Sequence, residues 1–388
     1  MRTWGTSVML AANKRFPSVV VAVVLVNLAV QPLTARSATY DYVAPQVAPA
    51  IAATLGTAQI AAILNETAPN KPYLVAYQLT TTDANNNVAG AAPLKVVPTD
   101  DAQHPYLGVF HNQINSTQFA TYLGYSTDLR VWHTIGQIHS PASQPDLRIL
   151  PDDSVVYAEE YNPSGRPYVR VQYYGNGAVT GLEALIANPA VAATEAITLP
   201  GTSLAKADGT PEFGRITYSG AIASSTLEIT HHFYYLGQRD IEADGTLTNF
   251  KTWSSPTDTT VDNLVTNAGG NGKIGDREVF KVGNQVFEVV EAQVNPKSGS
   301  DYGSWRLFLV NKTQNTVQKL SPVLSGGAQS LGNPTVSFVN LPPASPDATP
   351  VPALVFTCFV FGANNYGTPL GGHMFVYPLE APRSTAAR

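Results

Sequence analysis

The stretch SQPDLRILPDDSVVYAEEY, residues 143–161, contains two runs rich in apolar and aromatic residues on either side of the turn sequence PDD. Runs of this kind around turn-forming residues predict an antiparallel β-hairpin. The open ends of a hairpin meet at one edge, so Asp146 should lie near Glu159 and Glu160. Because side chains alternate along a strand, only one of the two glutamates can face inward. The hairpin therefore predicts an acidic edge on one sheet.

The same hairpin pattern recurs in four further segments. The equivalent positions, 52 to 66 residues apart, are Pro93, Pro145, Pro211, Arg277 and Pro334. Each unit starts with a polar residue and returns in a more aromatic strand. Five such units predict an all-β fold, a five-bladed β-propeller, and the alternative is a pair of β-sandwiches. The last unit is one strand short, so the N-terminal segment KPYLVAYQLTT, residues 71–81, is expected to close the ring.

The N-terminal region has the pattern of a secretory signal peptide. Lys14 and Arg15 precede an apolar run, and small residues follow it up to Ser37. This pattern predicts cleavage near residue 37 and a secreted, extracellular protein, and an uncleaved membrane anchor is the alternative. The predicted organisation is a signal peptide at 1–37, an N-terminal extension at 38–70 with a helix at 49–65, the propeller at 71–380 and a C-terminal tail at 381–388.

The composition limits the partners. Of the 388 residues, 13% are charged, and the formal net charge is −5, so the chain has no basic surface for nucleic acid. No spacing of histidines or cysteines indicates a metal site, and scattered carboxylates fit only a loose calcium site. The sequence thus predicts no cofactor, no membrane contact after signal cleavage, and a monomer.

A short motif carries a resemblance to a known family. The segment YSTDLRVWHTI, residues 125–135, contains Ser126, Asp128, Leu129 and Trp132 in the pattern S-x-D-L-x-x-W. Such a segment suits a turn from a third to a fourth strand, with tryptophan packed between blades. The motif resembles that of five-bladed propeller glycoside hydrolases of the arabinanase, xylosidase and fructosidase type.

The resemblance implies catalytic carboxylates on the innermost strands of the first three blades. Asp146 and Glu212 match the second and third of these positions, while Lys95 stands where the first-blade acid is expected. Glu212 is the expected general acid, with Asp146 and Glu278 as further catalytic candidates. Pro-Asp and Pro-Glu at the start of a strand also occur as plain turn caps, which is the structural alternative.

Strand starts and strand ends should meet at one polar mouth. The residues expected to bind substrate there are Asp276, Arg277, His111, Glu160, His232 and Glu291. Asp276 and Glu278 should share one face of their strand while Arg277 takes the other, and a structural ion pair is the alternative role of Arg277.

The predicted function is a carbohydrate-active enzyme, a glycoside hydrolase that cleaves a poly- or oligosaccharide by general acid–base catalysis. Such an enzyme needs two carboxyl groups facing one cavity about 5 to 10 Å apart. The alternatives are a propeller lectin, which binds glycans without cleaving them, and a polysaccharide lyase. The repeat units differ at their key positions, which favours one central site over several equal ones.

Overall fold

The computed structural model describes the greater part of the chain. The described residues are 40–42, 55–91, 94–163, 167–199, 205–235, 241–255, 259–298, 301–322, 329–342, 350–361 and 371–379. The predicted signal peptide, the first part of the predicted helix at 49–65 and the C-terminal tail lie outside them. Among the helices in these ranges, none is both long and apolar enough to span a bilayer.

The strands form five sheets, one for each predicted blade. Blade 1 comprises β5 (Lys95–Pro98), β6 (Tyr106–Gln113), β7 (Phe119–Ser126) and β8 (Trp132–His139), with β3 (Thr80–Thr82) and β4 (Val88–Gly90) at its outer edge. Blade 2 comprises β9 (Ala142–Ile149), β10 (Val155–Tyr161), β11 (Tyr168–Tyr174) and β12 (Glu195–Thr198). Blade 3 comprises β13 (Ala205–Tyr218), β14 (Thr226–Tyr235), β15 (Ile241–Thr248) and β16 (Thr252–Ser254), with β1 (Tyr40–Tyr42) beside β13.

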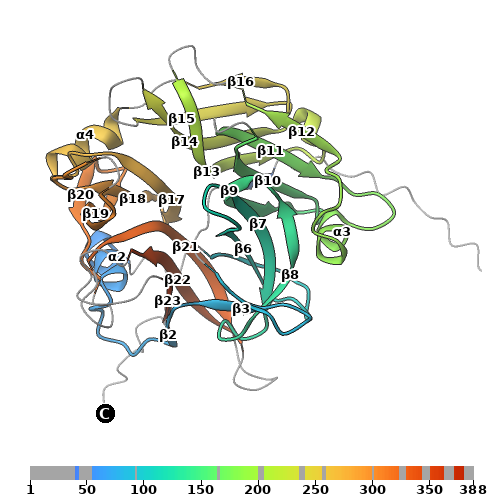
Figure 1. The fold of residues 1–388 in the computed structure, drawn as a ribbon, viewed down its shortest axis with the longest axis horizontal. Coiled ribbons are helices and arrows are strands. Elements are labelled where there is room, and N and C mark those ends of the chain that lie inside the picture. The colour runs from blue at the N-terminus through green and yellow to red at the C-terminus, as the bar shows by residue number, and fades with distance from the viewer. Residues whose placement is uncertain are drawn as a thin grey trace, which may run out of the picture. The chain divides into compact units, whose positions relative to one another are not determined.

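Blades 4 and 5 complete the ring (Figure 1). Blade 4 comprises β17 (Ile274–Val282), β18 (Gln285–Gln293), β19 (Trp305–Asn311) and β20 (Thr316–Lys319). Blade 5 comprises β21 (Leu331–Leu341), β22 (Val351–Val360), β23 (Gly371–Pro378) and the N-terminal strand β2 (Leu74–Tyr77), which pairs with β23. The innermost strands contact one another in the order β5, β9, β13, β17, β21 and back to β5. The predicted all-β five-bladed propeller is confirmed.

Within the described residues, three α-helices lie at the outside of the blades (Figure 1). Helix α2 (Thr57–Leu64) falls within the predicted helix, whereas α3 (Gly181–Ala187) and α4 (Thr260–Asn267) were not predicted. Two short 3₁₀ turns, η1 (Ile222–Ser224) and η2 (Tyr302–Ser304), add to them. Helices of seven or eight residues have little stability by themselves, so packing against the sheets stabilises them. The local sequence therefore gives little indication that these helices form.

The hairpin of blade 2 forms as predicted. Its turn is closed by hydrogen bonds between the backbone of Leu150 and that of Asp153 and Ser154. Asp153 has a positive φ of 61°, a conformation that aspartate tolerates in turns. The Asp152 carboxylate accepts from the backbone and hydroxyl of Ser154. Both aspartates are therefore turn residues.

The core consists of apolar side chains packed between neighbouring blades. Trp132 lies in a cluster that joins blade 1 to blade 5 and includes Val339, Val355 and Val376. The Asp128 carboxylate accepts from the backbone of Arg130 and Val131 in the turn from β7 to β8. The motif therefore has the local role predicted for it, a turn between the third and fourth strands with tryptophan between blades.

Four innermost strands share one irregularity, a β-bulge near the mouth. The register shifts in β9, β13, β17 and β21 each place two residues opposite one. The first bulge residue has positive φ in three of them, at Gln144 (49°), Thr210 (45°) and Asn333 (48°). A bulge re-aims the strand and tolerates proline, because the bulged amide does not join the ladder.

The bulges correct the alignment of the repeats. Pro145, Pro211 and Pro334 occupy the second bulge position in three different blades, as the repeats predict. In β17 this position is held by Asp276, one residue before the predicted Arg277. The error arose because β17 has Gly275 and Asp276 in place of the positive-φ residue and proline that mark the other bulges.

Candidate functional site

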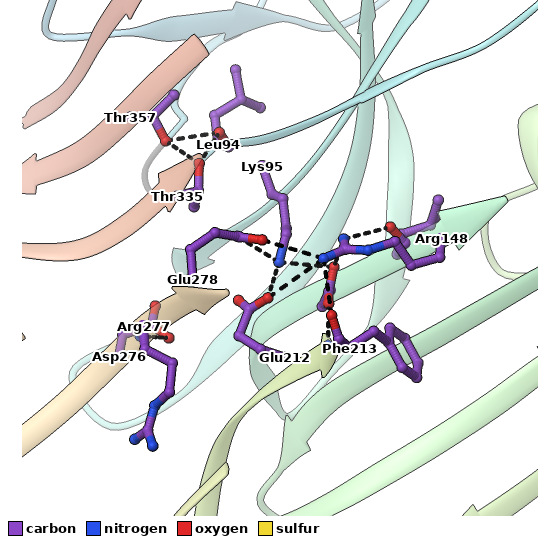
Figure 2. Close-up of polar contacts among 12 residues, drawn as sticks. Leu94, Lys95, Arg148, Glu212, Phe213, Asp276, Arg277, Glu278, Thr335 and Thr357 are labelled. Carbon is purple, nitrogen blue, oxygen red and sulfur yellow. Dashed lines mark hydrogen bonds and ion pairs between the residues drawn. The ribbon is translucent and has the colours of Figure 1, made fainter. Parts of the chain in front are cut away.

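The side chain of Lys95, on β5, lies among three carboxyl groups from three other blades (Figure 2). Its Nζ lies 2.9 Å from Oδ1 of Asp146 on β9 and 2.7 Å from Oε2 of Glu278 on β17. It also donates a hydrogen bond to Oε2 of Glu212 on β13. One lysine thus connects the innermost strands of blades 1 to 4.

Arg148 adds a second cation to the same cluster. It follows Asp146 by two residues, so both side chains share one face of β9, and Nη1 of Arg148 donates to that carboxylate. Its Nη2 lies 3.2 Å from Oε1 of Glu278 and 3.8 Å from Oε2 of Glu212. Oδ2 of Asp146 accepts from the backbone N–H of Phe213, at 2.7 Å. The cluster therefore holds three acids and two cations.

Burial and charge set the protonation of the cluster. Burial alone would raise the pKa of Asp146, but Arg148 and Lys95 outweigh it and hold the pKa below its usual value. The pKa of Glu212 rises well above its usual value, because it is buried and lies near two other carboxylates. Burial and Arg148 act to lower the pKa of Lys95, yet the three acids raise it, so the lysine stays charged. A proton on Glu212 would make the cluster neutral.

The predicted catalytic residues meet, but they do so around a lysine instead of around open space. Lys95, Asp146, Arg148, Glu212 and Glu278 are each at most 4% exposed. Sequence reasoning noted Lys95 and missed its contacts. Arg148 was missed as well, although its position two residues after Asp146 was a signal that both face the same way.

Blade 5 closes the ring beside this cluster with hydroxyl groups. The side chains of Thr335 and Thr357 donate to the backbone carbonyl of Leu94, the residue before Lys95, and Figure 2 shows this contact next to the ion cluster. Both threonines are buried. The strand that carries Lys95 is therefore fixed from the side opposite to the acids.

Arg277 was expected at the mouth and lies elsewhere. Its side chain is fully buried and extends away from Lys95 in Figure 2. It forms an ion pair with Glu242, at 3.1 Å, and donates to the backbone carbonyl of Gly275, at 2.7 Å. The prediction that Arg277 binds substrate is thus replaced by its alternative, a structural ion pair.

A cavity of about 1020 Å³ lies at the mouth and is formed by blades 1, 2, 4 and 5, and no residue of the ion cluster lines it. Predicted residues His111 and Glu291 line it. Residues not predicted include Gln144, Asn333, Tyr302, Trp305, Phe359 and Phe361. Gln144 and Asn333 begin the bulges of β9 and β21, and each directly precedes one of the repeated prolines. Their position before that proline could have identified them from the sequence. The aromatic residues come from separate loops and strand ends, and no sequence pattern brings them together.

The titratable groups of the cavity are weakly charged. Burial lowers the pKa of His111 to about 4, so its ring is neutral, and Nδ1 accepts from the backbone N–H of Gln144. Burial raises the pKa of Glu291 to about 7. The Glu291 carboxyl accepts from the backbone N–H groups of Asp276 and Asn333. Predicted residue Asp276 does not line the cavity, and burial and the nearby Glu291 raise its pKa well above its usual value.

The remaining predicted residues, Glu160 and His232, lie together near Gly209. A Cβ atom on Gly209 would lie 2.3 Å from Oε2 of Glu160 and 3.3 Å from the His232 ring. Burial raises the pKa of Glu160 to about 7, and Ser143 donates to it. Glu159 is buried and bonded to Arg170, so only one glutamate of the pair is available at the mouth. Glu160 and His232 do not line the cavity.

In the described ranges, no three His, Cys, Asp or Glu side chains are arranged to hold a metal ion.

Comparison with known proteins finds solved structures of low sequence identity. No protein-family model and no curated protein matches the chain. An endo-arabinase from Bacteroides thetaiotaomicron is 10% identical, with a TM-score of 0.45 over 79% of this chain and 99% of that one. An α-L-arabinofuranosidase from Fusarium graminearum, in complex with an iminosugar inhibitor, is 15% identical, with a TM-score of 0.39 over 78% and 86%.

A third solved structure is the α-L-arabinofuranosidase of Podospora anserina in complex with cellotriose. It is 9% identical, with a TM-score of 0.43 over 80% of this chain and 98% of that one. At such identities the similarity concerns the fold alone, and the five-bladed assignment rests on the sheets themselves.

Proposed function

We propose that the protein is a secreted carbohydrate-binding propeller whose central acids stabilise the ring and do not cleave the glycan. The observation that carries this proposal is the position of Lys95, paired with Asp146, Glu212 and Glu278. Glycoside hydrolysis needs one carboxylic acid at the leaving oxygen and one carboxylate at the water or the sugar carbon. Here the acids are buried and bonded to cations, so neither contact is available to a sugar.

Carbohydrate binding is supported by the cavity at the mouth of the ring. The cavity is at the upper end of the volume range typical of ligand pockets and combines aromatic rings with amide groups. Its aromatic lining includes Tyr302, which is 57% exposed. Large exposed rings beside polar groups are typical of a binding site.

Hydrolysis is the second candidate, and one observation favours it. Within the central cluster the pKa of Asp146 is lowered while that of Glu212 is raised. A pair of carboxyl groups with pKa values pushed apart is typical of a base and an acid in catalysis. This function would require a substrate-induced movement of Lys95 away from the acids.

The two functions are separated by one experiment on the mature protein. Binding of arabinan, xylan, galactan and glucan oligosaccharides is measured by calorimetry, and new reducing ends are counted in the same samples. We expect binding without new reducing ends, equally in the wild type and in Glu212→Gln. Cleavage by the wild type that Glu212→Gln abolishes would establish the hydrolase instead, because the amide cannot deliver a proton.

Secretion forms part of the proposal and has its own test. The basic residues Lys14 and Arg15 before an apolar run support removal of residues 1–37. N-terminal sequencing of the protein recovered from the culture medium is expected to begin near Ala38. A mature chain that begins at Met1 would overturn this part.

A further inference from the structure

The polar groups that line the mouth cavity are mostly uncharged amides. They come from blades 1, 2 and 5 and from the segment before β3, and are Gln78, Asn112, Gln113, Gln144 and Asn333. Glu291 is the one carboxyl group among the described lining residues, and neither lysine nor arginine is among them. Anionic sugars such as uronates are normally held by arginine or lysine. The lining therefore favours an uncharged ligand.

Two of these amides form a bridge across the mouth. Nε2 of Gln144 donates to Oδ1 of Asn333, at 3.2 Å, and so connects blade 2 to blade 5. Oε1 of Gln144 is buried and has no hydrogen-bond partner among the described residues. Gln144 also holds a positive φ of 49°, which costs free energy at a non-glycine position, whereas asparagine tolerates the positive φ of 48° at Asn333. The unpartnered oxygen of Gln144 is a buried polar atom that a ligand in the cavity could satisfy.

Aromatic rings form a wall on the side of blades 4 and 5. The rings of Tyr302 and Phe361 have centroids 5.2 Å apart, as do those of Phe359 and Phe361. Phe119, which is 38% exposed, stands on blade 1 and packs against His111, at 5.3 Å between ring centroids. The negative face of an aromatic ring attracts polarised C–H groups, such as those on one face of a pyranose or furanose. The wall therefore offers a stacking surface for a sugar ring.

We propose that this cavity binds an oligosaccharide of uncharged sugars. Gln144 and Asn333 form hydrogen bonds with the hydroxyl groups of one sugar unit, and the wall of Tyr302, Phe361 and Phe359 stacks on the next unit. The proposal rests on the proposed carbohydrate-binding function and specifies its ligand. An amide presents a donor and an acceptor side by side, which suits a pair of neighbouring hydroxyls. Ligand hydroxyls would replace the bridge between the two amides and satisfy the free oxygen of Gln144.

The test uses glycine substitutions, because glycine removes the amide and accepts positive φ without strain. Gln144→Gly and Asn333→Gly are compared with Thr210→Gly, a control at the equivalent bulge of blade 3, where φ is 45° and the side chain does not line the cavity. Tyr302→Ala removes part of the wall, and Val131→Ala is its control at another exposed apolar position. Urea unfolding curves confirm that each variant is folded.

The probes are neutral hexasaccharides of arabinose, xylose, galactose and glucose, and hexagalacturonate as the acidic probe. We expect at least one neutral probe to bind, with affinity about 5- to 10-fold lower in Gln144→Gly and Asn333→Gly and about 10-fold lower in Tyr302→Ala. The two controls should bind as the wild type does.

The other outcomes separate this inference from the function on which it rests. Binding of hexagalacturonate alone would overturn the inference and leave carbohydrate binding in place. Binding of a neutral probe that Asn333→Gly and Tyr302→Ala leave unchanged would overturn the assigned location. No binding of any probe would overturn the proposed function as well.

Discussion

Nζ of Lys95 lies 2.9 Å from Oδ1 of Asp146, and the two residues belong to the innermost strands of neighbouring blades. The same ammonium group also contacts Glu212 and Glu278, so a single side chain joins four blades near the axis of the ring. Buried charges persist only when they are paired, and removing one partner leaves the others unpaired at a cost of about 3–5 kcal/mol. The cluster is thus a structural element, and the following predictions depend on it.

Two substitutions that each replace a central acid by its neutral amide should lower the free energy of unfolding by different amounts. Asp146 is held ionised by Arg148 and Lys95, so Asp146→Asn is expected to lower the free energy of unfolding by about 3–5 kcal/mol at pH 7. Burial and the two neighbouring carboxylates raise the pKa of Glu212 well above its usual value, so Glu212→Gln is expected to lower the free energy of unfolding by less than Asp146→Asn does. Urea unfolding at pH 7 measures both. A larger loss for Glu212→Gln than for Asp146→Asn would contradict the opposite pKa shifts of the two acids.

Packing between blades 1 and 5 should depend on Trp132. The ring is buried in the cluster that joins these blades, so Trp132→Ala is expected to cost about 3–5 kcal/mol through lost contacts and a new cavity. Trp253, in the corresponding turn of blade 3, is only partly buried, and Trp253→Ala should cost less. Thermal unfolding compares the two. Equal losses would show that the motif residue has no special role between blades.

Glu291 should make stability depend on pH in a known direction. Its pKa rises from 4.5 to about 7 in the folded protein because it is buried. Between these values the folded state keeps a proton that the unfolded chain releases, so stability falls as the pH rises from about 4.5 to about 7, by a few kcal/mol, and levels off above.

The difference in unfolding free energy between the wild type and Glu291→Gln isolates the contribution of Glu291, because Glu160 and the buried histidines titrate in both proteins. Unfolding free energies measured at steps from pH 4 to pH 9 should show the wild type losing stability relative to the variant across that window. A difference that stays constant with pH would mean that burial does not raise the pKa of Glu291.

The sequence predicted the features that depend on local pattern. Alternating strands, the turn at Asp152 and Asp153, and the tryptophan turn ending at Trp132 all follow from residues close together in the chain. The convergence of Asp146 and Glu212 followed from the repeat, because equivalent strands of a propeller meet at one axis, whereas Glu278 lies one residue beyond the equivalent position in β17. These parts of the fold and site could be predicted.

Contacts between distant residues could not be predicted. The pairing of Lys95 with three acids depends on side-chain length and direction across the axis, which no repeat encodes. Arg277 was expected at the mouth because it stands near the start of a strand, but its side chain pairs with Glu242 of blade 3, a contact that the repeat does not encode. The cavity, with Gln144 and Tyr302, combines separate loops and strands whose proximity exists only in the folded ring.

The central claim is that Lys95 holds the acids in a closed cluster, and a double-mutant cycle of Lys95→Met and Glu278→Gln tests it most directly. The unfolding free energy is measured in urea at pH 7 for the wild type, both single variants and the double variant, with the exposed Lys319→Met as a control. Lys95→Met is expected to lose about 3–5 kcal/mol, and adding Glu278→Gln should recover about 1 kcal/mol or more, because it removes a negative charge that Arg148 alone does not balance. Losses that simply add, or a Lys95→Met variant as stable as Lys319→Met, would contradict the claim.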